Sequence, residues 1–148
     1  MKTTIKLKGS EALFKKFKAY GEQGEKDFAE QTQNAAQNIR ARALIEVPRR
    51  DKNLANNIFY DKVNRFVYKI FVNLNNAPYG PFVEFGTGGL VDIPKGWERL
   101  AATFKGKGIK KINLPARPYL YPAFRDGSTQ YVRDLKSILK QLSNKFNR

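Results

Sequence analysis

Two short segments rich in proline and aromatic residues constrain this sequence most, namely Ala77–Thr87 and Leu114–Phe124. In the first, Pro78 and Pro81 hold φ at about −65° and lack a backbone N–H. Both properties suit the opening turn of a helix, whose first amides have no intrahelical partner. Gly86 can then adopt the left-handed conformation that ends a helix. The sequence therefore predicts a short helix with fixed ends in the first segment.

Glu84 is the only charged residue of that first segment. Its neighbours along the chain are apolar: Tyr79, Phe82, Val83 and Phe85. A carboxylate in such surroundings points to water or meets a cation. Arg117, between Pro115 and Pro118 in the second segment, is the partner that we predict for it. The alternative is a solvated Glu84 and a solvated Arg117, because most surface charges are unpaired or weakly paired.

The clearest strand signal precedes the first segment and runs from Arg65 to Leu74. Alternating residues predict one face of Phe66, Tyr68, Ile70, Val72 and Leu74, and another of Arg65, Val67, Lys69, Phe71 and Asn73. A period of two is typical of a strand in a sheet. Ile58–Lys62 is predicted to pair with it as an antiparallel hairpin.

The N-terminal part is predicted to be mainly helical after a short strand or extended arm at Thr3–Lys8. Ser10 is a suitable N-cap for a helix that reaches Tyr20. A longer helix extends to about Val47, because the residue before Pro48 disfavours helical geometry. Its apolar stripe consists of Phe28, Ala35, Ala36, Ile39, Ala43 and Val47. We expect this helix to lie on the sheet, with self-association as the weaker alternative.

The C-terminal part is predicted to contain short strands and one long helix. Leu90–Ile93 and Ile109–Leu114 read as strands, and a short helix is expected to open at Pro94. From Tyr119 onward, apolar residues recur at spacings of three and four, which predicts a C-terminal helix, either continuous or interrupted at Gly127.

Together these elements predict an α+β fold in a single domain over residues 1–148. In this fold a small antiparallel sheet packs against a long N-terminal helix and a C-terminal helix.

Composition excludes several kinds of chemistry. The chain has no cysteine and no histidine, so disulfides, thiol catalysis and histidine general bases are absent. Glu84, Asp92 and Glu98, the acidic candidates for a metal-dependent nuclease, stand in no recognisable motif. We therefore predict no enzyme and no cofactor. No signal peptide or membrane span is predicted, which indicates a protein made in the cytoplasm.

The two specific segments also resemble a known family. Pro78-Tyr79, followed by Val83-Glu-Phe-Gly-Thr87 and then by Ala116-Arg-Pro-Tyr-Leu-Tyr-Pro-Ala123, is similar to the head-tail joining or tail-completion (neck) proteins of long-tailed bacteriophages. The similarity covers most of the chain, but only these two segments are specific. The chain differs from many relatives at Val47–Leu54, in the turn that follows the long helix.

The resemblance implies a mobile hairpin or flap between the two specific segments, in a region where function and variability usually concentrate. It also implies a structural virion protein of the neck. Such a protein forms a homo-oligomeric ring that joins the DNA-filled head to the tail or completes the tail, with other neck, connector and tail proteins and the passing DNA as partners. The residues that it implicates in structure and assembly are Pro78, Tyr79, Glu84, Phe85, Gly86, Thr87, Arg117, Pro118 and Tyr119.

The net charge of +15 leaves one alternative open, a basic nucleic-acid-binding module. A charge of this size steers a protein toward anionic surfaces. The candidate contacts with DNA or an acidic partner lie in two basic loops, for which the alternative is a solvated loop without a partner: Arg49, Arg50, Lys105, Lys107, Lys110 and Lys111. Against this alternative, the basic residues are scattered, and no nucleic-acid recognition motif is present.

Overall fold

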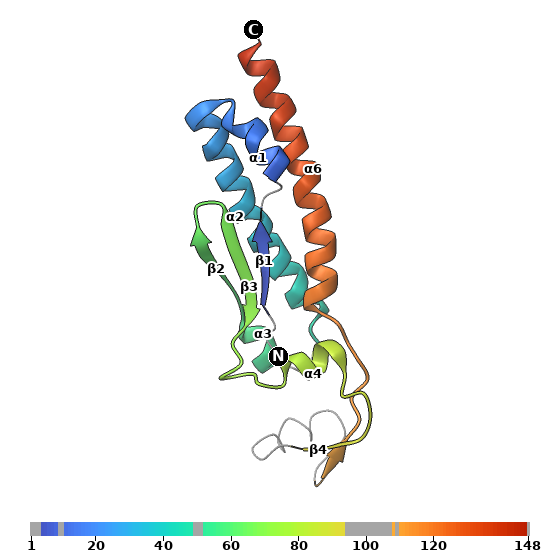
Figure 1. The fold of residues 1–148 in the computed structure, drawn as a ribbon. Helices are drawn as coiled ribbons and strands as arrows, with labels where there is room; N and C mark the ends of the chain where they lie inside the picture. Colours follow the sequence, from blue (N-terminus) through green and yellow to red (C-terminus); the bar gives the residue numbers. More distant parts are fainter. Residues whose placement is uncertain (1–3, 9–10, 49–51, 94–107, 109, 148) are drawn as a thin grey trace.

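The computed structural model describes residues 4–8, 11–48, 52–93, 108 and 110–147. In chain order, the elements of Figure 1 are β1 (Thr4–Lys8), α1 (Glu11–Lys18), α2 (Gly21–Glu46), α3 (Lys52–Asn56), β2 (Ile58–Asn64), β3 (Val67–Val72), α4 (Gly80–Phe85), β4 (Val91–Asp92), β5 (Lys111–Ile112) and α6 (Leu120–Phe146). The predicted α+β class is confirmed.

The two long helices, α2 and α6, lie side by side and run in opposite directions along the molecule (Figure 1). Every residue of the predicted α2 stripe is buried, together with Thr32. A Cβ atom on Gly127 of α6 would overlap the Ile39 side chain of α2. The absence of a side chain at Gly127 thus lets the two helices approach closely. Helix α6 runs through this glycine without interruption, which decides between the two predicted alternatives.

One buried polar pair joins these helices. The hydroxyl oxygens of Thr32 and Tyr131 lie 2.7 Å apart, and the Thr32 hydroxyl also lies 2.8 Å from the carbonyl oxygen of Phe28. Burial raises the pKa of Tyr131 to about 12, although the hydrogen bond with Thr32 acts in the opposite direction. The phenol therefore stays protonated, and hydrogen-bonded, across the physiological pH range.

The main sheet has the strand order β1-β3-β2, with both pairs antiparallel. Ile70 is at the centre and faces Ile5 on one side and Tyr60 on the other. The buried residues of β3 are Tyr68, Ile70 and Val72, which confirms the predicted alternation. This face packs against α2, as predicted, while α6 covers another side of the same helix. Strand β3 is shorter than the predicted Arg65–Leu74, because Arg65 and Phe66 form the hairpin turn and Leu74 lies in the turn that follows the strand.

A short helix, α3, begins within the turn expected to follow the long helix at Val47–Leu54. Leu54 in its centre is fully buried, so this side chain anchors the turn to the core. The side-chain amide of Asn57 donates to the backbone oxygen of Asn53 at 2.8 Å and closes the helix end. Five residues are too few for helical periodicity to show in the sequence.

Helix α1 packs on the upper part of α2 through aromatic side chains. Phe14 contacts Phe28 and Phe66 at ring-centroid distances of 4.9 and 4.6 Å, and Phe17 contacts Phe28 at 5.4 Å. These contacts tie α1, α2 and the end of the β2–β3 hairpin together, as offset aromatic pairs do in protein cores.

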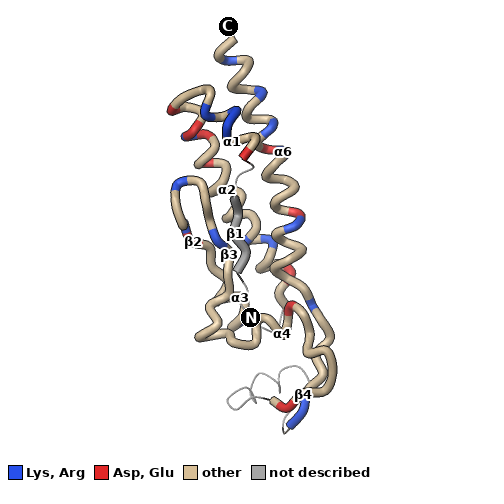
Figure 2. The backbone as a smooth tube through the Cα atoms, in the orientation of Figure 1, with Lys and Arg blue, Asp and Glu red and all other residues tan. Residues whose placement is uncertain are grey.

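Strands β4 and β5 pair antiparallel in a second, two-stranded sheet, shorter than the predicted strands Leu90–Ile93 and Ile109–Leu114. The helix predicted from Pro94 lies outside the described residues, and the mobility expected for this flap stays a prediction. Figure 2 shows that charge is unevenly placed on the rest of the molecule, with acidic residues on the first turns of α2 and basic residues along α6.

Candidate functional site

The two specific segments meet in space at one corner, where α4 approaches the start of α6. Glu84 on α4 is only 3% exposed. Its carboxylate accepts hydrogen bonds from three consecutive backbone amides, those of Tyr119 (2.9 Å), Leu120 (2.9 Å) and Tyr121 (2.8 Å). Glu84 therefore serves as an N-cap for α6, supplied from a helix that lies far away in the sequence.

The first turn of α6 requires acceptors from outside the helix, and this cap supplies them. The first amides of any helix lack intrahelical acceptors, and a side chain at the N-cap position usually accepts from them. Tyr119 stands at that position in α6 and makes no such side-chain bond. A carboxylate is well suited to replace it, because negative charge is stabilised at the positive end of the helix dipole. Hydrogen bonds to charged groups contribute about 1.5–3 kcal/mol each.

A second contact fixes the same two helices. Tyr119 is fully buried, and its hydroxyl donates to the backbone oxygen of Gly80 at 3.0 Å. A Cβ atom on Gly80 would come within 3.1 Å of Val72 and 3.0 Å of the Tyr119 hydroxyl oxygen. The first residue of α4 is thus held between the sheet and the start of α6.

Beyond α4 the two segments run alongside each other and exchange backbone hydrogen bonds. The amide of Arg117 donates to Val83 O at 2.8 Å, and the amide of Thr87 donates to Leu114 O at 3.1 Å. The amide of Leu114 donates to the Thr87 hydroxyl at 3.0 Å. Gly86 is required for two reasons, since its φ is 73° and a Cβ atom would lie 2.8 Å from Leu114 O.

The predicted pairing of Glu84 with Arg117 is wrong. No salt bridge joins the two among the described residues, and Arg117 is exposed. Arg117 contributes its backbone amide, whereas the amides at the start of α6 replace its guanidinium as partners of Glu84. Glu84 nevertheless fixes the end of α4 against the C-terminal helix, through these three amides.

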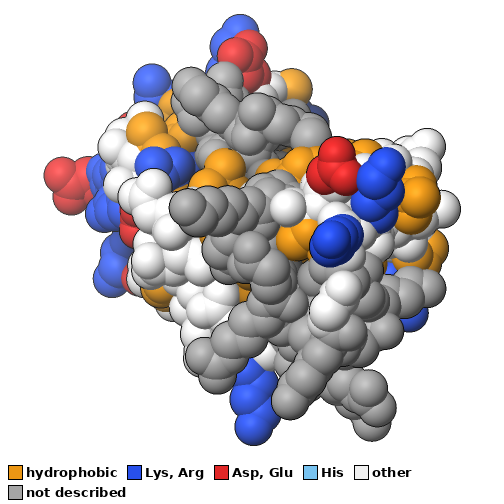
Figure 3. Space-filling model, turned by 90° about the horizontal axis from the view of Figure 1, so that it is seen from below, with side chains coloured by type: hydrophobic (Ala, Val, Ile, Leu, Met, Phe, Trp, Pro, Cys, Tyr) orange, Lys and Arg blue, Asp and Glu red, His pale blue; other side chains and the backbone are white. Residues whose placement is uncertain are grey.

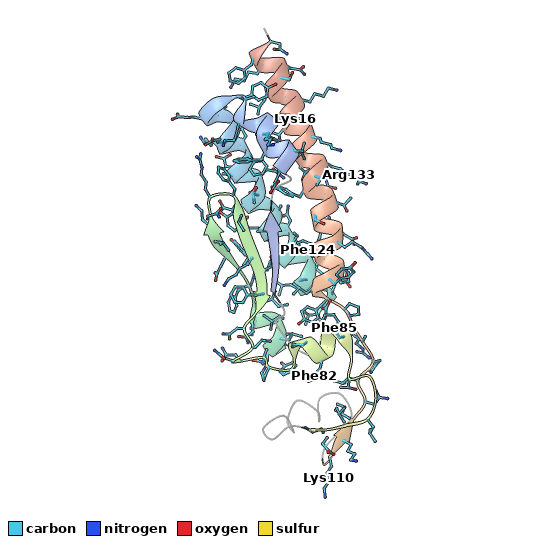
Figure 4. All side chains as sticks on the ribbon, viewed as in Figure 1. Lys16, Phe82, Phe85, Lys110, Phe124 and Arg133 are labelled. Atoms are coloured by element: carbon cyan, nitrogen blue, oxygen red, sulfur yellow. The ribbon has the colours of Figure 1, made fainter. Side chains whose placement is uncertain are left out.

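Aromatic side chains emerge at the surface of this corner. Phe85 and Tyr121 are each 58% exposed, and Phe82 and Phe124 are half-buried beside the core. We call these four residues the aromatic corner. Figure 4 places Phe82 and Phe85 on α4 next to the start of α6, which carries Phe124. Hydrophobic side chains also reach the surface elsewhere at this end of the molecule (Figure 3). Of the four, sequence reasoning assigned only Phe85 to the site.

The basic loop residues are only partly described. Lys110 and Lys111 are exposed beside the β4–β5 pair, and Lys111 lies 3.9 Å from Asp92. Arg49, Arg50, Lys105 and Lys107 lie outside the described residues. Three other residues were predicted to take part in assembly. Pro78 and Pro118 are exposed, whereas Tyr79 is buried. The side-chain amide of Asn53 lies 3.0 Å from the Tyr79 hydroxyl.

The described residues offer no centre for metal-dependent chemistry. In this part of the chain, no three His, Cys, Asp or Glu side chains are grouped so that they could hold a metal ion. Glu84 is engaged by backbone amides, Asp92 pairs with Lys111 at the surface, and Glu98 is not described. In the described ranges, no helix has the length and apolar character needed to cross a membrane.

Comparison with known proteins identifies the family. The family model HK97-gp10_like, described as "Bacteriophage HK97-gp10, putative tail-component", matches residues 11–86, just over half of the chain. The match runs from α1 to the glycine that ends α4, and so includes the Glu84 side of the corner. Neither the curated proteins nor the solved structures contain a match. The chain therefore belongs to the HK97-gp10-like family and is a structural protein of a bacteriophage.

Proposed function

We propose that this chain is a subunit of the phage neck. In this proposal, several copies form a ring that joins the DNA-filled head to the tail or completes the tail, and the ring contacts neighbouring connector and tail proteins. Membership of a phage tail-component family supports this assignment. The structure of the α4–α6 corner gives this proposal further support.

The corner combines a rigid frame with an exposed apolar surface. Glu84, Tyr119 and the paired backbones of the two segments fix its shape. Phe85 and Tyr121 stand on this frame and expose most of their side chains to solvent. Large aromatic residues on a rigid surface are typical of the energetically dominant part of a protein interface. We infer that the aromatic corner contacts a neighbouring protein in the virion, and that the assembly residues named above hold it in place.

The sheet supplies a second surface suited to assembly. Strand β2 forms one edge of it, so the backbone groups on the side of β2 that faces away from β3 have no strand partner in the described part of the chain. Exposed strand edges readily add a strand from another chain. Phe59 and Val63, which are partly exposed on the same strand, add apolar surface at this edge.

The experiment that tests the function is removal of the gene product from the phage that encodes it. Electron microscopy of the particles should show DNA-filled heads separate from finished tails. Supplying the full chain in trans should restore joined particles. Normal tailed particles in the absence of the protein would overturn the proposal. As a point-variant counterpart, F85S/Y121S should fold like the wild type and fail to restore joined particles.

A further inference from the structure

A groove between α1 and α6 is rimmed by lysines at the end of the molecule opposite the aromatic corner. It has a volume of about 460 Å³ and is lined by Lys16, Ala19, Tyr20, Lys136, Leu139, Lys140 and Ser143. We call it the basic groove. In the described ranges, no carboxylate lies within 4.0 Å of the ammonium groups of Lys16, Lys136 or Lys140. These three cations therefore have no ion-pair partner in the part of the chain that the structure describes.

The groove is the centre of a longer basic face. Arg133 precedes Lys136 and Lys140 on α6 at spacings of three and four, so these side chains share one side of the helix. Figure 4 shows Lys16 on α1 and Arg133 on the adjoining part of α6. The middle of a helix has no end dipole that would favour positive charge. The local structure of α6 therefore gives no reason for this concentration of cations.

The same chain carries a segment of opposite charge, the first turns of α2 from Gly21 to Glu30. This acidic segment holds four acidic residues and one lysine, and so has a net charge of −3: Glu22, Glu25, Lys26, Asp27 and Glu30. Only Glu22 lies in the first turn, where the helix dipole favours an acid. Arg65 pairs with Glu25 at 3.2 Å, and Lys26 lies 4.0 Å from Glu30. The excess negative charge of the segment remains.

The two surfaces lie at the same height on opposite flanks of the molecule. Because α2 and α6 are antiparallel, the start of α2 and the later turns of α6 are at the same end (Figure 1). Figure 2 shows the acidic residues of α2 on one flank of this end and the basic residues of α6 on the other. The basic flank of one copy is therefore complementary in charge to the acidic flank of another copy.

We propose that the basic groove of one copy receives the acidic segment of the next copy, in a head-to-tail contact. This inference rests on the proposed function and names the contact within the ring. A head-to-tail contact repeated from copy to copy gives a closed ring when the rotation between successive copies leads back to the first copy. Otherwise it gives an open filament. Two surfaces at equal height along the molecule favour the closed ring. An exposed ion pair contributes little on its own, so the contact depends on several pairs formed together.

The test uses the full chain at about 1 mM, in low salt, with its self-association followed by sedimentation velocity and native mass spectrometry. The wild type should associate, and its dissociation constant should rise at least about tenfold from 0.05 to 0.5 M salt, because salt screens exposed charges. K136E/K140E and E22K/E30K should each lose association. The four substitutions combined in one chain should restore it, because the complementary charges have then exchanged places.

The matched control is R42E/K52E, which changes two exposed basic residues outside the basic groove, the acidic segment and β2 and should associate like the wild type. Circular dichroism and melting curves should show that all variants fold. A wild type that remains monomeric, or oligomers that survive both charge reversals, would overturn the proposed contact. So would high-affinity binding of duplex DNA lost in K136E/K140E without loss of association.

Cysteine cross-linking gives an independent readout, because the chain has no cysteine of its own. E30C/K136C should form a ladder of disulfide-linked multimers, whereas E30C/K52C should not. The failure of this contact is distinguishable from failure of the neck function. Rings that form through another surface would leave the neck assignment intact, whereas normal tailed particles without the protein would remove the assignment itself.

Discussion

The α4–α6 corner and the α2–α6 helix pair use different means to fix the same C-terminal helix. At the corner, a buried carboxylate accepts from three backbone amides. Along the helix pair, apolar side chains pack around a glycine, and Thr32 and Tyr131 form one buried polar pair. The corner therefore depends on the carboxylate of one residue, whereas the helix pair depends on the volumes of the side chains that pack between the helices.

This difference has a consequence for assembly. Close-packed helices tolerate changes that preserve total volume, whereas a buried polar group has no substitute if its partners are amides that must be satisfied. The corner carries the exposed Phe85 and Tyr121, so its frame and its surface are joined in one element. The helix pair carries charge on its outer faces and can change those charges without loss of its core.

The largest expected effect is at Glu84. E84A leaves three amides at the start of α6 without an acceptor, two of them in buried residues, and should lower the free energy of unfolding by about 3–5 kcal/mol. E84Q keeps the shape and one acceptor oxygen, so its loss should be smaller, about 1–3 kcal/mol. Urea unfolding measures both. Hydrogen exchange should accelerate at the amides of Tyr119, Leu120 and Tyr121 in E84A.

A stability loss below about 1 kcal/mol in E84A would show that water replaces the carboxylate and that the corner is not held by it. The matched control is E30Q, which removes an exposed carboxylate from α2 and should change the free energy of unfolding by less than about 0.5 kcal/mol.

The next effect concerns the helix pair. G127A places a methyl group against Ile39 and should cost about 2 kcal/mol, although alanine is normally favoured over glycine in a helix by about 1 kcal/mol. In an I39A background the space is available, so the same substitution should become stabilising. A double-mutant cycle by thermal unfolding measures this change of sign. An effect of G127A that is equal in both backgrounds would mean that Ile39 does not set the distance between the helices.

How much of this could be predicted from the sequence depends on the range over which a signal acts. The α2 stripe and the alternation in β3 were predicted because helical and strand periods are local. The ends of α4 followed from Pro81 and Gly86 for the same reason. The partner of Glu84 was not predicted, because its acceptor role involves amides 35 to 37 residues further along the chain.

A signal for this partner was nevertheless present. Pro118 marks the start of α6, and Tyr119 at the N-cap position is not one of the short polar residues (Ser, Thr, Asp or Asn) whose side chains usually accept there. A helix start without its own cap, together with a lone carboxylate in an apolar segment, indicates a cap supplied from elsewhere. The partners of the basic α6 face carry no such signal, because they lie on another molecule in our proposal.

A smaller, pH-dependent effect is expected at Tyr131. Its pKa is raised from 10.0 to about 12 in the folded chain. A raised folded pKa means that the stabilisation is complete below pH 10 and is lost as the pH rises toward 12. The loss should approach about 2 kcal/mol. Y131F should lower stability by about 1 kcal/mol at neutral pH, because the bond with Thr32 is lost.

Y131F should also show a flatter decline in stability between pH 9 and about 12. Because both proteins contain the same lysines, the difference between their slopes isolates the tyrosine. Equal slopes in urea unfolding across this range would mean that Tyr131 ionises in the folded chain as easily as in the unfolded one.

The smallest effect is expected at Arg117, and it distinguishes the frame of the corner from its surface. The backbone amide of Arg117 donates to Val83 O at 2.8 Å, whereas its side chain is exposed and forms no ion pair with Glu84. R117A should therefore change the free energy of unfolding by less than about 0.5 kcal/mol. T87V, which removes the hydroxyl that accepts from the Leu114 amide, should cost about 1–2 kcal/mol in the same urea experiment.

If R117A were as costly as E84A, the guanidinium would be a partner of the carboxylate after all. If R117A folds normally and fails only to restore joined particles, Arg117 belongs to the contact surface that the corner presents.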